Sequence, residues 1–351
     1  MSDTAPVPYS DDVEQLLPDE DAVVDETVRT MRHTMEQTFE KLRHQTSGTH
    51  AKSHGIVTGS LEVAAGLPSE LAQGLFAAPA TYEAVVRYAS EPGAVEPDTV
   101  QRARGLALKV LDVPGDKLRD GWTSQDFLFN TWSTIPQGDA ATYLNAIRAR
   151  DEHFDHYLAT TAATLAGHPS PQESQFDRTP NHHPVGYRYY SQGAFRHGDF
   201  FGKYALVPVS EAAVAAADRE VDRHDPPGIL RDLVREFYAD QGATYALQVQ
   251  LCTDQKRMPV EDASEPWDEE VSPYRTVATL TLPVQESFSP ARRTYAEDVL
   301  SWRPWYGLVA HRPLGSINRV RDRVYAELGA YRHAQNARAE ENPTSLAQVP
   351  A

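Results

Sequence analysis

The chain has 351 residues, of which 40% are hydrophobic, so it is long enough to bury a sizeable core in one large domain or two ordinary ones. Its formal net charge of −17 disfavours binding to nucleic acid and to anionic membrane surfaces. No apolar segment approaches the roughly 20 residues that a membrane-spanning helix needs. The acidic N-terminus is unlike a secretory signal, and the single Cys252 excludes an intramolecular disulfide. We therefore expect a cytoplasmic protein without integral membrane association.

The first elements in chain order are a leader and a helix. Residues 1–20 are acidic and predict a flexible leader. Residues 21–45 carry apolar side chains at intervals of three to four, which indicates an amphipathic helix. These side chains are Val24, Val28, Met31, Met35, Phe39 and Leu42.

From Gly55 onward, short β-prone segments separated by Gly, Pro and Asp predict antiparallel strands. The segments form two blocks, which are 55–63, 83–90, 105–113 and 126–133, followed by 186–195, 200–209, 244–253 and 275–284. Helices are expected at 138–165, 210–221, 227–239 and 290–338, and residues 339–351 are expected to be a disordered tail. About eight strands with helices at both ends predict an α+β fold, a β-barrel with helical additions, in one domain over residues 21–338.

The predicted C-terminal helix carries the first candidate site. Arg321 and Tyr325 are four residues apart and share a helix face, where the guanidinium favours the phenolate. A phenolate suits ferric iron, and tyrosine is a known axial ligand of haem. Arg332 lies about two turns further along the same face and could reach a carboxylate at the edge of a macrocycle. An Arg-rich surface helix with a core tyrosine would give the same pattern.

Two histidines stand at the start of the first predicted strand. His50, preceded by Thr49, is a candidate general acid and base, because histidine titrates near neutral pH. His50 and His54 also have the spacing of a metal-binding pair on a helix, but Gly48 and Gly55 argue against a helix here. The competing interpretation is a pair of solvent-facing loop histidines.

Two strand residues complete the candidate set. Asn130 lies in an apolar and hydroxyl-rich strand, where a buried amide needs hydrogen bonds and could donate one to a bound oxygen species. Arg87 interrupts an apolar strand, which costs free energy unless the guanidinium meets an anion. A turn asparagine and an arginine paired with an acidic side chain are the ordinary alternatives.

In this order and spacing, the segments resemble the haem catalase superfamily over roughly residues 45–335. His50-Ala51-Lys52 resembles the distal-histidine motif, and Asn130-Thr131 resembles the distal asparagine. Residues 87–90 with 104–109 are similar to the strand–loop–strand after the histidine, and residues 321–325 to the proximal helix. The chain has no room for the long arm and C-terminal domain of many catalases, which favours the small, catalase-related peroxidase branch.

The resemblance implies a catalase-like antiparallel barrel that binds haem b. Tyr325 would be the axial ligand of the haem iron, and Arg321 would hold it as phenolate. His50 and Asn130 would line the distal side, and His50 would move a proton between the two oxygens of a bound peroxide. The haem propionates would pair with Arg87 and Arg332.

Two departures from the family pattern bear on the reaction. Thr49 stands where true catalases usually carry an apolar residue, and a catalase-related allene oxide synthase that acts on fatty-acid hydroperoxides also has threonine there. Ser47 stands where many catalases have a propionate-binding arginine, so this contact is missing or is supplied elsewhere, for example by Arg43.

These features favour a haem-dependent peroxidase or hydroperoxidase that acts on H2O2 or on organic hydroperoxides, including those of fatty acids, with an organic electron donor. A true catalase that dismutates H2O2 and a non-catalytic haem- or lipid-binding barrel are the alternatives. The sequence leaves the hydroperoxide, the donor and homo-oligomer formation open. His182, His183 and His197 have no part in this scheme and are expected to face solvent.

Overall fold

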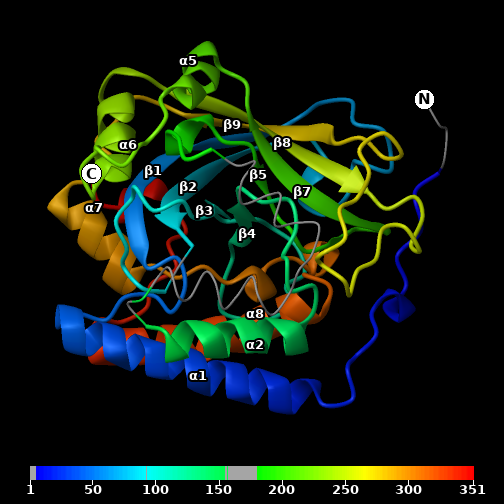
Figure 1. The fold of residues 1–351 in the computed structure, drawn as a ribbon. Helices are drawn as coiled ribbons and strands as arrows, with labels where there is room; N and C mark the ends of the chain where they lie inside the picture. The colour runs from blue at the N-terminus through cyan, green and yellow to red at the C-terminus, as the bar shows by residue number, and fades with distance from the viewer. Residues whose placement is uncertain (1–4, 92, 155, 157–179) are drawn as a thin grey trace.

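The structure, a computed structural model, describes residues 5–91, 93–154, 156 and 180–351 (Figure 1). Its centre is an antiparallel sheet in the order β5-β4-β3-β2-β1-β9-β8-β7, which closes into an eight-stranded barrel where β5 pairs with β7. A further strand, β6, pairs with β7. The strands are β1 (Lys52–Val63), β2 (Thr81–Ser90), β3 (Arg104–Val110), β4 (Gln125–Asn130), β5 (Tyr189–Tyr190), β6 (Phe195–His197), β7 (Phe200–Pro208), β8 (Ala243–Leu251) and β9 (Arg275–Leu282). The predicted barrel of about eight strands is confirmed.

Three long helices form a layer below the barrel in the view of Figure 1, namely α1 (Glu20–Leu42), α2 (Ala140–Glu152) and α8 (Ser316–Gln335). The shorter helices are α5 (Glu211–Ala215), α6 (Ile229–Asp240) and α7 (Pro290–Thr294), which continues into the π-helical turn η5 (Tyr295–Val299). Single 3-10 turns are η1 (Asp11–Val13), η2 (Gly74–Phe76), η3 (Pro184–Gly186), η4 (Ala216–Asp218), η6 (Pro304–Tyr306), η7 (Val309–His311) and η8 (Leu346–Gln348).

Side-chain alternation along the strands decides what faces the helix layer. Successive residues of a strand point to opposite faces of the sheet. The barrel interior is apolar and buried, and on β2 to β4 it is lined by Val86, Tyr88, Leu106, Leu108, Phe127 and Phe129. The residues between them, such as Arg87 on β2 and Asn130 on β4, therefore project from the outside of the barrel.

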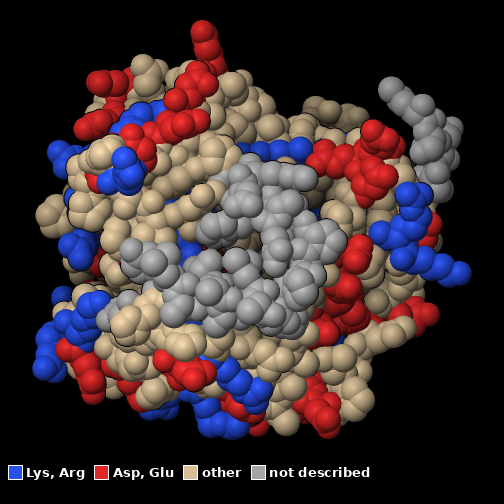
Figure 2. Space-filling view, in the orientation of Figure 1, with Lys and Arg blue, Asp and Glu red and all other residues tan. Residues whose placement is uncertain are grey.

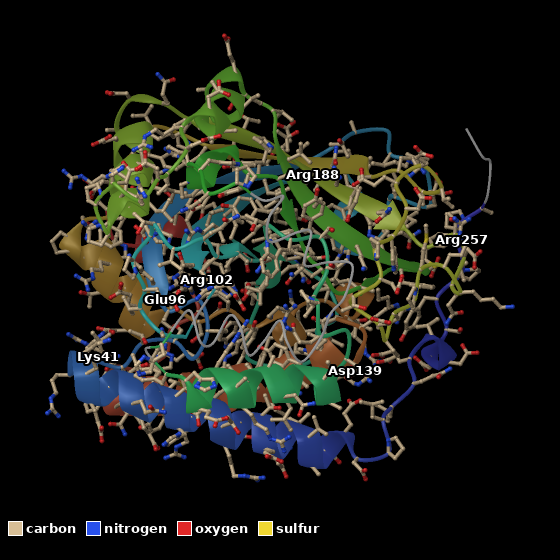
Figure 3. All side chains as sticks on the ribbon, viewed as in Figure 1. Lys41, Glu96, Arg102, Asp139, Arg188 and Arg257 are labelled. Carbon is tan, nitrogen blue, oxygen red and sulfur yellow. The ribbon has the colours of Figure 1, made fainter. Side chains whose placement is uncertain are left out.

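The helix layer has its own apolar core between the three long helices. The amphipathic helix predicted over 21–45 is confirmed as α1, although its last residue, Leu42, is 41% exposed. Asp139, labelled in Figure 3, caps the start of α2, since its carboxylate accepts a hydrogen bond from the Thr142 amide at 2.8 Å. The core consists of Val24, Val28, Met31, Met35, Ala140, Ile147, Val320, Val324 and Leu328.

The segment before α1 differs from the flexible leader that its composition predicts. The amide of Val7 donates to the carbonyl of Cys252 at 2.8 Å, which ties the segment to the end of β8. The Glu14 carboxylate pairs with Arg312 and Arg319, both at 2.6 Å. The arginines that fix this acidic segment lie about 300 residues away, so local sequence does not reveal them.

The C-terminal segment 339–351 also packs on the folded chain, in contrast to the disordered tail expected from sequence. Glu340 pairs with Arg303 at 2.8 Å, and the amide of Leu346 donates to the Glu83 carboxylate at 2.7 Å. Val349 is buried in an apolar cluster beside Leu300. These contacts are again with residues remote in sequence.

Three expected elements are shorter than predicted. The segment 186–195 pairs as a strand only at β5 and at Phe195, where β6 begins, and the helical pattern after Pro290 is interrupted between Leu300 and Gly315. Gly315 adopts a left-handed φ of 89° immediately before α8. Of the helix expected over 138–165, α2 accounts for residues 140–152, and residues 155 and 157–165 lie outside the described residues.

The expectation of three solvent-facing histidines is wrong. His182, His183 and His197 are all buried. His197 bonds the Tyr204 hydroxyl at 2.8 Å and the Leu71 carbonyl at 3.1 Å. The ring nitrogens thus find partners inside the protein, which is what a buried histidine requires.

The acidic excess of the chain is unevenly spread over the visible face. Figure 2 shows acidic side chains gathered over α5 and α6, whereas basic and acidic side chains alternate along the helix layer. Within the described part of the chain, no helix combines the length and apolar character needed to cross a bilayer.

Candidate functional site

A cavity lies between the outside of strands β2 to β4 and the helix layer. It encloses about 930 Å³ of space, its opening to solvent included. Its remaining walls come from residues 47–50, from the segment 296–302 and from α8. All the residues predicted for the site line this one cavity, namely Thr49, His50, Arg87, Asn130, Arg321, Tyr325 and Arg332.

The barrel side of the cavity is a flat floor built by strand register. Arg87, Ala107 and Leu128 lie side by side across β2, β3 and β4. Ala89, Gly105 and Asn130 form the neighbouring row. The small side chains in the middle of both rows leave room for a planar group above the sheet. We call these six residues the cavity floor.

The residues 48–50, here called the distal loop, hold His50 over this floor. His50 has a left-handed φ of 51°, its amide donates to the Glu91 carbonyl at 2.8 Å, and its own carbonyl accepts Arg87 Nη2 at 2.8 Å. A Cβ placed on Gly105 would lie 2.3 Å from two atoms of the imidazole, so only glycine fits beneath the ring. Burial lowers the pKa of His50 to about 4, with Glu91 opposing the shift. The imidazole is therefore neutral at pH 7 and able to accept a proton.

Thr49 and Asn130 present opposite hydrogen-bonding groups to the cavity. The Thr49 hydroxyl donates to the Glu91 carbonyl at 2.9 Å, so its proton is already used and only its lone pairs can receive a hydrogen bond. The Asn130 carbonyl oxygen accepts the Trp132 amide at 3.0 Å, which leaves the side-chain NH2 as the donor toward the cavity.

On the opposite wall, α8 carries Tyr325 and Arg321 on one face, as their spacing predicts. Tyr325 is half-buried and lines the cavity, and no hydrogen bond from its hydroxyl to a described residue is seen. Burial raises the pKa of the Tyr325 phenol, while Arg321 acts in the opposite direction. Arg321 itself bonds Asn318 at 3.2 Å and Gln192 at 3.3 Å. Arg321 thus favours the phenolate as predicted, but the effect of burial is larger.

Two buried guanidinium groups lie at the same side of the cavity. Arg87 and Arg332 are 6% and 4% exposed, and neither has a carboxylate within ion-pair distance among the described residues. Burial lowers the pKa of each to about 10, and the charge of Arg87 further lowers that of Arg332. Arg332 bonds the Leu300 carbonyl at 2.9 Å, whereas Arg87 Nε has no partner in the described structure. Such a pair is stabilised by an anion.

Two other candidates of the sequence, Arg43 and His54, do not line the cavity. Ser47 lines the cavity, but Arg43 is exposed at the end of α1 and is not among the lining residues, so it does not replace the missing arginine there. His54 is buried in a bulge of β1, where it bonds Ser90 at 2.8 Å. In the described ranges, no group of three or more His, Cys, Asp or Glu could hold a metal ion, so the alternative His50–His54 pair gains no further ligands.

Sequence reasoning missed three residues of the site. Gly105 and Gln192 line the cavity, and Glu91 supports the distal loop from behind. Period-two alternation from Arg87, carried across paired strands, would have placed Gly105 on the floor. Gln192 has a left-handed φ of 63° and follows the short strand β5, and no local signal identifies it.

No protein-family model and no curated protein sequence matches this chain. Solved structures that are similar include a fungal catalase, a bacterial catalase and catalase A from Saccharomyces cerevisiae, with TM-scores of 0.58, 0.58 and 0.59. Each is 15% identical, and the matches cover 90%, 94% and 93% of this chain but 68%, 64% and 67% of those catalases. The chain therefore has a catalase-like fold and spans about two thirds of the length of these catalases.

Proposed function

We propose that this protein binds haem b in the cavity and uses it to react with H2O2 or an organic hydroperoxide, with an organic compound as electron donor. One observation carries the proposal. A phenol, a neutral imidazole, a carboxamide and two buried guanidinium groups, drawn from segments up to 282 residues apart, converge on one cavity. A structural role would not require these particular groups to face the same space.

The cavity suits a flat dianionic macrocycle on three counts. The two rows of its floor have small residues, Ala107 and Gly105, at their centres, and Gly105 leaves room for the His50 imidazole. Arg87 and Arg332 are buried without a carboxylate, as the propionates would require. Tyr325 supplies a phenolic oxygen from the opposite wall, a donor type that suits ferric iron. Bound iron would also offset the burial that otherwise keeps this phenol protonated.

The bound haem would supply an iron centre that accepts the two oxidising equivalents of a peroxide. The residues of the chain would perform the proton transfer. His50, neutral at pH 7, accepts the proton of the incoming hydroperoxide and returns it to the leaving oxygen. The Asn130 NH2 donates a hydrogen bond that orients the peroxide, because its carbonyl is held by Trp132.

The geometry of Thr49 favours peroxidase or hydroperoxidase chemistry over rapid dismutation of H2O2. Its hydroxyl donates to Glu91, so toward the cavity it acts as an acceptor beside His50. A hydrogen bond from the peroxide O–H to this second acceptor would compete with the one to His50, which disfavours a second H2O2 as reductant. A true catalase remains the alternative on the same scaffold. A non-catalytic haem or lipid carrier would have no use for the His50–Asn130 pair.

The deciding experiment is the visible absorption spectrum of protein expressed with haem supplied. We expect an intense Soret band with the charge-transfer bands of a high-spin ferric phenolate complex. Tyr325→Phe should abolish these bands or greatly weaken haem binding, because the ligand oxygen is gone. Tyr331→Phe, on the same helix but outside the cavity lining, is the matched control and should keep them. Absence of haem from wild-type protein, or an unchanged spectrum in Tyr325→Phe, would overturn the assignment.

Turnover then separates the candidate functions. The proposal expects faster reaction with alkyl or lipid hydroperoxides, plus a donor, than oxygen evolution from H2O2. Rapid oxygen evolution with little donor oxidation would show a true catalase. Haem binding without either reaction, or binding of an apolar ligand in place of haem, would favour the carrier.

A further inference from the structure

Glu91 holds the distal loop from behind. Its carbonyl accepts both the Thr49 hydroxyl at 2.9 Å and the His50 amide at 2.8 Å. The chain after Glu91 packs closely on the loop, since a Cβ on Gly93 would lie 2.4 Å from the Gly48 carbonyl oxygen. The left-handed backbone of His50 is therefore fixed by the position of Glu91.

The side chain of Glu91 is in turn anchored to the helix layer. Its carboxylate pairs with Arg150 at 2.9 Å, and the two side chains are 19% and 29% exposed. Arg150 lies in the last turn of α2. In Figure 3, the label Asp139 marks the start of α2. The other end of the helix lies below the loop that carries Glu96 and Arg102, which follows Glu91 in the chain. The ion pair thus links α2 to the support of the distal loop.

The same pair acts electrostatically on His50. Burial is the main cause that lowers the pKa of His50, Glu91 raises it, and Arg87, Arg321 and Arg150 lower it. Although burial acts to raise it, the pKa of Glu91 lies below its ordinary value, chiefly because of Arg150, so the carboxylate is charged. Among the described residues, the charged groups that act on the imidazole are Glu91 after β2, Arg87 on β2, Arg150 on α2 and Arg321 on α8, and the phenol of Tyr325 lines the same cavity.

We propose that Glu91 and Arg150 form a positioning pair for His50. The pair holds the imidazole over Gly105, and the balance of its two charges sets the pH below which the ring takes up a proton. The inference rests on the proposed function for the role of His50 in proton transfer. The charge balance itself is a property of the chain without haem, which makes it separately testable.

The test follows the imidazole directly by NMR on the full chain without added haem, with selectively labelled histidine and a His50→Gln variant to assign the signal. Arg150→Gln leaves Glu91 uncompensated beside His50, and the titration midpoint should rise by about one pH unit. Arg150→Lys keeps the charge and should stay near wild type. The double variant Glu91→Gln with Arg150→Gln removes both charges and should return the midpoint toward wild type.

The direction in which the His50 titration midpoint moves in each variant distinguishes a balance of charges from a merely structural contact. A structural role predicts that Arg150→Gln and the double variant disturb the His50 signal alike, and that result would overturn the proposal. If Arg150→Gln does not fold, Glu91→Gln alone decides. Loss of the only carboxylate among these groups should keep the imidazole neutral to lower pH than in wild type, and an unchanged or raised midpoint would contradict the inference.

A second readout applies once haem is bound. The acid limb of the rate of reaction with hydroperoxide should move to higher pH in Arg150→Gln and not in Arg150→Lys. Failure of the chain to bind haem would remove this readout and the proposed function, but would leave the NMR result standing.

Discussion

At the scale of single residues, Gly105 is the position where one methyl group has a definite effect. The three atoms nearest to a Cβ added there all belong to the His50 imidazole, two of them at 2.3 Å. We predict that Gly105→Ala displaces the ring and slows the reaction with hydroperoxide at least about tenfold, since misplacement of a reacting group by about 1 Å can cost far more. Haem content per chain should be retained.

The measurement is the rate of reaction with hydroperoxide per bound haem. Gly228→Ala, before α6, is the matched control, because a Cβ there meets only the flexible end of Arg231 at 3.3 Å. A Gly105→Ala protein that reacts at the wild-type rate would show that His50 is not the group that moves the proton.

Under the proposed function, Thr49 sets the balance between turnover of organic hydroperoxides and dismutation of H2O2. Thr49→Val removes the hydroxyl that now bonds Glu91 and with it the second acceptor beside His50. We predict that oxygen evolution from H2O2 rises relative to turnover of an alkyl hydroperoxide. Thr49→Ser keeps the hydroxyl and should keep the wild-type ratio. Comparison of the two rates at equal haem content checks this, and an unchanged ratio in Thr49→Val would sink the argument from threonine.

At the scale of elements, local patterns predict what local forces determine. The four-residue spacing of Arg321 and Tyr325 predicts that both lie on one face of α8. The apolar side chains that recur every three to four positions in residues 24–35 predict the helix α1. Strand alternation separates the cavity floor from the barrel interior in the same way. The pair Glu91–Arg150 is different, because docking of α2 brings together residues 59 positions apart. The interruption before α8 likewise depends on tertiary contacts.

The tail shows the same limit and gives a prediction about an element. In the segment 339–351, Glu340 pairs with Arg303 and the Asn342 side chain accepts a hydrogen bond from Lys109. Val349 of the same segment is buried beside Leu300, which lines the cavity. We predict that removal of 339–351 lowers the thermal unfolding midpoint by at least about 5 °C, since each kcal/mol is worth about 2–4 °C in a chain of this order of size. It should also weaken haem binding.

Calorimetry of the truncated and full-length chains checks this prediction. Glu340→Gln keeps the tail but removes the Glu340 charge that pairs with the buried Arg303, and it should have a smaller effect. A truncated protein with the full-length midpoint would mean that the tail contributes nothing to the fold, as its composition alone suggested.

At the scale of the whole molecule, buried neutral histidines govern stability in mild acid. Burial lowers the pKa of His183 and of His197 to about 4, and that of His54 and His311 well below the ordinary value. The unfolded chain therefore binds more protons than the folded chain between pH 6.5 and 4, and stability falls as the pH falls through this window. His33, whose pKa is raised beside Asp151, acts in the opposite direction but is largely exposed.

The prediction is a loss of unfolding free energy of about 2 kcal/mol between pH 7.5 and 5 for each histidine with a folded pKa near 4. Carboxylates whose pKa is lowered, such as that of Glu91, also stabilise the folded chain, but this stabilisation is lost mainly at pH values below this window. Urea unfolding at the two pH values measures the loss. His197→Gln should be less stable at pH 7.5, because its bonds to Tyr204 and Leu71 are changed, but should lose about 2 kcal/mol less on acidification. An equal loss in wild type and variant would mean that His197 is already protonated in the folded barrel. The hydrogen bonds of His197 argue against this result, since the Tyr204 hydroxyl can donate only to a neutral ring.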